Sequence, residues 1–128
     1  MEVTLKVRPH HADGYIIQAF EGDDEEGSYS VILKQSLEYV ENGSINPDRK
    51  HDICRQSIDW LEGVEKVITN ISIPLLPSDV RCGLGGVDYD LTIDGEEGAL
   101  LSFSWWKELP ECWKGLQEIV DKLKNCFG

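Results

Sequence analysis

Apolar and polar residues alternate along the first third of the chain. Every second residue from Val3 to Val7 is apolar, which predicts a half-buried strand. Runs rich in aromatic and branched residues predict two more strands, at Tyr15–Phe20 and Ser28–Leu37. The stretch Glu21–Gly27 holds five acids and two glycines, so we expect a solvated loop there. This part of the chain is therefore predicted to be an antiparallel meander.

In two later segments the apolar residues recur at intervals of three and four, which is the period of an amphipathic helix. The first helix is predicted to run from Asp52 to Asn70, with the Asp52 carboxylate accepting the free backbone N–H groups at its start. The second is predicted to run from Pro110 to Phe127, because a proline is tolerated where a helix begins. Each helix carries an apolar stripe that has to pack against a partner surface.

Two alternating runs, Val87–Ile93 and Ala99–Trp106, flank the acidic, glycine-containing turn Asp94–Gly98. This arrangement predicts a β-hairpin. Strands, a helix, a hairpin and a second helix in that order predict an α+β fold. We expect an antiparallel sheet of about five strands with two amphipathic helices packed on one face, as a single domain over residues 1–128.

The chain is strongly acidic, with 24 Asp and Glu against 12 Lys and Arg and a formal net charge of −12. Nucleic acid and anionic membranes are not expected partners, because both attract cationic surfaces. A basic protein partner is expected instead. The N-terminal residues contain no apolar run of signal length, and no stretch approaches the roughly 20 apolar residues that span a bilayer, so a cytoplasmic protein is expected.

Two acidic clusters, one in the Glu21–Gly27 stretch and one in the hairpin, are the candidate partner-binding surface. Alternation along the hairpin places Trp106 on the same face as Asp88 and Asp90, away from the helices. An exposed aromatic side chain beside carboxylates suits contact with a basic cleft. The alternative is that Trp105 and Trp106 both cap the core. The candidate residues are Asp23, Asp24, Glu25, Glu26, Asp88, Asp90, Asp94, Glu96, Glu97 and Trp106.

The sequence offers no pattern that predicts catalysis, a cofactor or a metal site. No nucleophile elbow, phosphate-binding glycine loop or zinc-protease helix is present. The acids that begin at Asp88 resemble the start of a calcium loop, but Ile93 stands where that loop needs glycine. The four cysteines lack paired spacing, so we expect free thiols. We therefore expect a protein that is not an enzyme and has no catalytic, cofactor-binding or metal-binding residues.

Three motifs resemble a known class of proteins. They are a glycine-rich hairpin start over Gly83–Ile93, the Ser104-Trp105-Trp106 run and the Pro110-Glu111-Cys112-Trp113 helix start. Together they resemble small acidic bacterial immunity proteins of polymorphic-toxin and contact-dependent growth inhibition systems, or a related bacterial family that shares these motifs. The resemblance implies a cytosolic immunity protein that binds and neutralises a cognate basic toxin, with a nuclease as the expected toxin type.

Two other functions stay open from the sequence. One is a small intracellular protein-binding or adaptor domain with a basic partner of its own, and the other is a small hydrolase. The acidic clusters favour a binding protein over a hydrolase, because no nucleophile and base stand in a defined arrangement.

Overall fold

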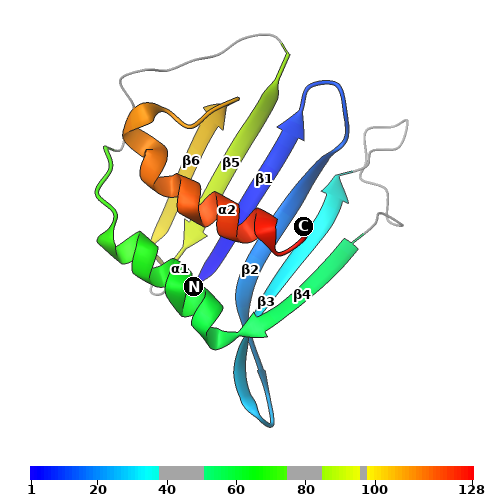
Figure 1. The fold of residues 1–128 in the computed structure, drawn as a ribbon, viewed down its shortest axis with the longest axis vertical. Coiled ribbons are helices and arrows are strands. Elements are labelled where there is room, and N and C mark those ends of the chain that lie inside the picture. Colours follow the sequence, from blue (N-terminus) through cyan, green and yellow to red (C-terminus); the bar gives the residue numbers. More distant parts are fainter. Residues whose placement is uncertain (38–50, 75–84, 96–97) are drawn as a thin grey trace.

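One antiparallel sheet forms the centre of the computed structural model, which describes residues 1–37, 51–74, 85–95 and 98–128 (Figure 1). The six strands lie in the order β4-β3-β2-β1-β5-β6. Their bounds are β1 (Glu2–Pro9), β2 (Gly14–Asp24), β3 (Gly27–Leu37), β4 (His51–Ser57), β5 (Val87–Asp94) and β6 (Leu100–Trp106). The predicted hairpin is confirmed as β5 and β6, and the opening meander as β1, β2 and β3.

The helices cover one face of this sheet (Figure 1). They are α1 (Ile58–Asn70) and a 3-10 segment η2 (Glu111–Leu116) that continues into α2 (Gln117–Asn125). The predicted α+β fold, with both helices on one face of an antiparallel sheet, is confirmed, and the sheet has six strands where about five were expected. Among the described residues, no helix is long and apolar enough to cross a bilayer.

The core lies between the sheet and the helices, and β1 runs through its middle. Leu5 is buried between Ile17 of β2 and Leu91 of β5, its register partners on either side. Alternation along β1 also buries Val3 and Val7 on the helix side. The C-terminal helical segments complete the core from the other layer, with the buried residues Trp113, Leu116, Ile119, Val120 and Leu123.

Residues 51–57 form an edge strand and not the first turns of a helix. The predicted start at Asp52 is therefore wrong, since α1 begins at Ile58 with Ser57 as its N-cap residue. β4 pairs with β3 so that Ile53 lies opposite Leu33, and backbone hydrogen bonds of the sheet take the place of helical ones. Ile53 is 66% exposed, so its apolar side chain contributes to no buried helix stripe.

The second predicted helix is present, but its first turns are 3-10. Pro110 is the N-cap residue of η2, and α2 ends at Asn125. Trp113 anchors this segment, because its ring packs edge-on against Phe103 with centroids 5.3 Å apart and its indole N–H donates to the Pro74 carbonyl at 2.7 Å.

The cysteines that the structure describes are free thiols, as expected. Cys54, Cys112 and Cys126 are each half-buried, and Cys82 lies outside the described residues. Burial and the neighbouring thiol of Cys54 raise the pKa of Cys126 to about 11, so Cys126 stays protonated at neutral pH.

A buried serine of β3 fixes the turn from β4 into α1. The Ser30 side chain is fully buried, and its hydroxyl donates to the Ser57 carbonyl at 2.8 Å and accepts from the Leu61 backbone N–H at 3.1 Å. Ser57 makes no side-chain cap hydrogen bond of its own. The Ser30 hydroxyl therefore bridges two backbone groups in the first turn of α1, and it ties the start of the helix to the sheet.

Replacement of this hydroxyl should destabilise the fold. We expect Ser30→Ala to lower the free energy of unfolding by about 1–3 kcal/mol, because the buried Leu61 N–H and the Ser57 carbonyl lose a hydrogen-bond partner. Urea unfolding followed by circular dichroism measures the change. Ser28→Ala is the control, because it removes a serine hydroxyl whose hydrogen bond, to Asp23, is exposed to water; it should cost less than about 0.5 kcal/mol. Equal midpoints for the two variants would contradict this role of Ser30.

Candidate functional site

Three hairpin residues singled out from the sequence, Asp88, Asp90 and Trp106, share the sheet face opposite the helices. The strand register pairs Asp88 with Trp106 and Asp90 with Ser104. The predicted position of Trp106 beside the two aspartates is thus confirmed. Trp105 points the other way, into the core, where it stacks on Tyr89 with ring centroids 5.4 Å apart. The alternative in which both tryptophans cap the core therefore holds for Trp105 alone.

Cations and donors of the same chain already occupy this row of carboxylates. Arg8 lies 2.6 Å from the Asp90 carboxylate, which also accepts a hydrogen bond from Ser104. The carboxylate of Asp88 lies 3.0 Å from the His10 ring nitrogen. An incoming cation would have to displace these partners, which makes the row a weak candidate for binding a basic protein.

Trp106 is held in a similar way at the end of β6. Its indole N–H donates to the Gly85 carbonyl at 2.7 Å, and the Lys107 ammonium lies 4.6 Å from its ring centroid. The side chain is half-buried and has little freedom to act as an anchor for a partner.

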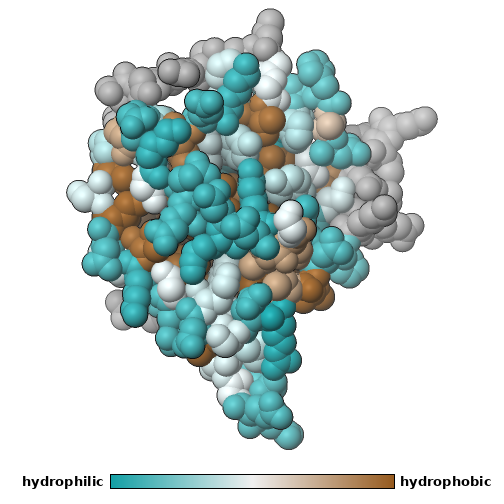
Figure 2. Space-filling view, viewed as in Figure 1, coloured by the Kyte–Doolittle hydropathy of each residue, from teal (hydrophilic) through white to brown (hydrophobic). Residues whose placement is uncertain are grey.

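The first acidic cluster lies on a projecting hairpin and not on an extended loop. The expected loop Glu21–Gly27 is wrong, because β2 continues to Asp24 and β3 starts at Gly27. The turn itself is only Glu25 and Glu26, and Gly27 follows with a φ of 125°. Strand pairing tolerates these acids because both faces of a two-stranded ribbon meet water. The ribbon extends beyond the rest of the sheet (Figure 1), and its surface is hydrophilic (Figure 2).

One carboxylate of this ribbon is paired. The Arg55 guanidinium lies 2.5 Å from Asp24 and 3.6 Å from the centroid of the Tyr29 ring. Hydrogen bonds from Arg55 and from the Glu26 backbone N–H lower the pKa of the Asp24 carboxyl from its ordinary value. Asp23 accepts a hydrogen bond from Ser28 at 2.7 Å. No ion pair of the described residues involves the side chain of Glu25 or Glu26.

The two predicted clusters meet only in part. Asp94 ends β5 opposite Glu2, at the same end of the sheet as the hairpin of β2 and β3, whereas Asp88 lies at the opposite end of β5 (Figure 1). Glu96 and Glu97 lie outside the described residues. The structure adds two acids of α1 that the sequence analysis did not single out. We call the following exposed carboxylates the acidic end: Glu2, Glu21, Asp23, Asp24, Glu25, Glu26, Glu62, Glu65 and Asp94.

Aromatic rings hold many of the cations that could neutralise these acids. Five described Lys and Arg residues lie over rings, at 3.6 to 5.9 Å from a centroid: Lys34, Arg55, Lys107, Lys122 and Lys124. In the described part of the chain, the pair of Arg55 with Asp24 is the ion pair that reaches the acidic end. Among the described residues, the carboxylates of the acidic end other than Asp24 thus have no ion-pair partner.

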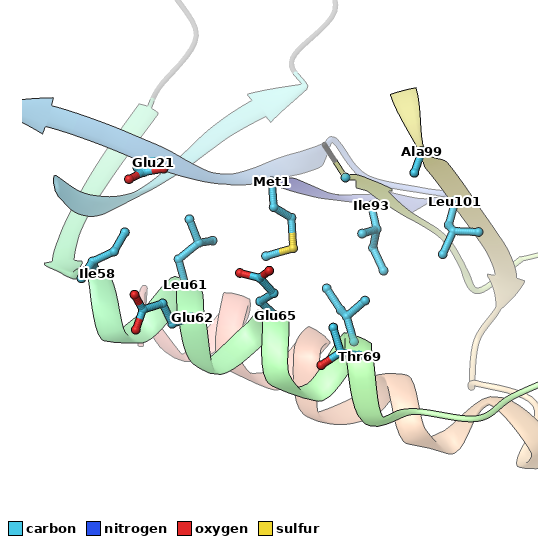
Figure 3. Close-up of a pocket in the computed structure, with 12 residues that line it drawn as sticks. Met1, Glu21, Ile58, Leu61, Glu62, Glu65, Thr69, Ile93, Ala99 and Leu101 are labelled. Atoms are coloured by element: carbon cyan, nitrogen blue, oxygen red, sulfur yellow. The ribbon is translucent and has the colours of Figure 1, made fainter. Parts of the chain in front are cut away.

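A groove of about 370 Å³ opens at the acidic end, between α1 and the sheet (Figure 3). Its walls are mainly apolar, and Glu21, Glu62 and Glu65 are its acidic lining residues. Figure 3 shows Glu62 and Glu65 on α1 and the Met1 side chain between that helix and the sheet. The other apolar lining residues include Ile58, Leu61, Ile68, Ile93, Ala99 and Leu101.

This arrangement suits protein recognition, in which an apolar centre lies within a charged rim. Among the described residues, no three of His, Cys, Asp and Glu come together as a metal site. No family model, no curated protein and no solved structure matches this chain. The candidate site therefore rests on the geometry of the acidic end.

Substitution of Arg55 tests its ion pair with Asp24 directly. In Arg55→Gln we expect the Asp24 pKa to rise toward the ordinary value of an aspartate, because its main hydrogen-bond partner is gone. Since this pKa is lowered in the folded state, the pair stabilises the fold above the ordinary carboxyl pKa, and the effect is lost as the pH falls through the lowered value. Carboxyl NMR titration measures the shift.

Lys66→Gln is the control, because it removes a cation of α1 that forms no ion pair with Asp24. It should leave the pKa of the Asp24 carboxyl unchanged. An Asp24 pKa that is the same in Arg55→Gln and in the parent would contradict the pairing.

Proposed function

We propose that this chain is a binding protein whose acidic end docks on a basic protein partner. The observation that carries the proposal is the cluster of exposed carboxylates at one end of the sheet, of which Asp24 alone forms an ion pair among the described residues. Such a surface steers a cationic partner over long range and raises the association rate. The action proposed is binding without a catalytic step.

Within this class, an immunity protein is the function that we favour. The net charge of −12 and the resemblance of three sequence motifs to bacterial immunity proteins support it. An inhibitor of a nuclease has to present anions where the substrate would present phosphates. The projecting ribbon of β2 and β3, with Glu25 and Glu26 at its turn, offers carboxylates that can enter such a cleft. The proposed partner is thus a cationic toxin domain, acting in the same cytoplasm as this chain.

Association kinetics test the proposal. The partner to use is the protein encoded next to the gene of this chain, and we expect its toxicity on expression to be relieved by co-expression of the chain. Glu25→Lys with Glu26→Lys should slow association about tenfold at low salt, and the difference should shrink as salt rises, because exposed charges are screened. Biolayer interferometry measures both rate constants.

The matched control is Glu111→Lys with Glu118→Lys, which makes the same change of charge on η2 and α2. It should slow association much less than reversal at the ribbon turn. If the two pairs of substitutions slowed association equally, only the net charge of the chain would matter, and the acidic end would have no special role. An unchanged rate in both pairs, or no complex with the neighbouring protein, would contradict the proposal.

A further inference from the structure

The groove at the acidic end exposes apolar side chains that the helix layer does not cover. Leu101 faces the helix side of the sheet, opposite Ile93 in the register, and yet it is 44% exposed. Ile58 and Ile68 of α1 are only half-buried where they line the same groove. In Figure 2 hydrophobic surface is visible beside the hydrophilic cover of the helices. Apolar surface that lines a groove and is rimmed by polar groups is typical of a binding site.

The apolar lining continues along α1 beyond this groove. A second hollow of about 300 Å³ shares Ile68, Ile93 and Leu101 with the first, and it extends to Ile71 and Phe103. The two hollows together form an apolar strip between α1 and the β5–β6 hairpin. Such a strip has room for more than one side chain of an occupant.

The charges around the groove restrict the occupant. Glu21 of β2 and Glu62 and Glu65 of α1 line it, and none of its described lining residues is Lys or Arg. A fatty acid or another anionic ligand would meet three like charges at the rim, which disfavours it. A group with an apolar body and a positive charge gains from both the walls and the rim.

We infer that this groove is the anchor site for a basic amphipathic segment of the protein partner. An apolar side chain of that segment inserts beside Met1, between α1 and the sheet and against Leu101, and its Lys or Arg side chains lie on Glu62 and Glu65. The inference rests on the proposed function and deepens it: the charges of the ribbon steer the partner, and the groove holds it.

The probe is a short amphipathic peptide of leucine and lysine, tested by isothermal titration calorimetry on the full chain. A peptide of equal length and charge, with serine in place of leucine, is the matched probe. We expect the leucine-containing peptide to bind about tenfold more tightly, because only its side chains can fill the apolar groove.

Variants of the chain locate the binding. Leu101→Ser should lower the affinity for the leucine-containing peptide about fivefold or more, because it removes part of the apolar wall. The control is Leu100→Ser, since Leu100 neighbours Leu101 on β6, points to the opposite face and is 63% exposed. It should leave the affinity unchanged. Glu62→Gln with Glu65→Gln should also weaken binding, with a smaller salt dependence, whereas Glu111→Gln with Glu118→Gln should not.

Equal affinity of the two peptides, or equal effects of Leu101→Ser and Leu100→Ser, would overturn the groove as anchor site. A thermal melt checks whether each variant is folded. If a serine variant is unfolded, the glutamine pairs still test the groove. Failure here is distinct from failure of the proposed function. If the groove variants do not change the peptide affinity, while charge reversal at Glu25 and Glu26 still slows association of the basic partner, the groove inference alone is wrong. If the peptide depends on Leu101 while that charge reversal has no effect on the partner, the proposed function is wrong and the ligand chemistry of the groove stands.

Discussion

The hydroxyl of Ser30 ties the start of the first helix to the sheet. Its two hydrogen bonds, to the Ser57 carbonyl and the Leu61 N–H, join β3 to the first turn of α1 inside the core. A helix that starts there carries Leu61 and Val64 into the core and leaves Glu62 and Glu65 at the groove beside the ribbon. The position of Glu62 and Glu65, and with it the α1 wall of the groove, therefore depends on the contacts of one buried hydroxyl.

The distribution of cations explains why most carboxylates of the acidic end have no ion-pair partner among the described residues. Arg8 forms an ion pair with Asp90 and the His10 ring lies against Asp88, while lysines such as Lys122 and Lys124 lie over aromatic rings. A cation that lies over an aromatic ring stabilises a neighbouring carboxylate less than a cation in a direct ion pair does. The acids at the lower end of the sheet in Figure 1 thus keep their field, and a steered encounter with a basic protein is the physical use of such a field.

Local patterns predicted most of the fold but less of the site. The β5–β6 hairpin, and with it the shared face of Asp88 and Trp106, follows from strand alternation and a glycine turn. The edge strand β4 was missed because its apolar residues continue the spacing of α1, and only pairing with β3 decides between strand and helix. Acids three apart on α1, Glu62 and Glu65, can be recognised as an exposed row in the sequence. Their place beside Glu21 depends on the turn that Ser30 holds, which is a long-range contact that no local pattern reveals.

We propose that the acidic end, and not the row of Asp88 and Asp90, is the surface that attracts cations. An NMR titration of the labelled chain with hexalysine tests it most directly, because amide shifts report where a purely cationic probe binds. We expect the largest shifts on the Glu21–Gly27 segment and on α1 around Glu62 and Glu65, and we expect them to vanish at high salt. Shifts that gather instead on the β5 residues from Asp88 to Asp90 would contradict it.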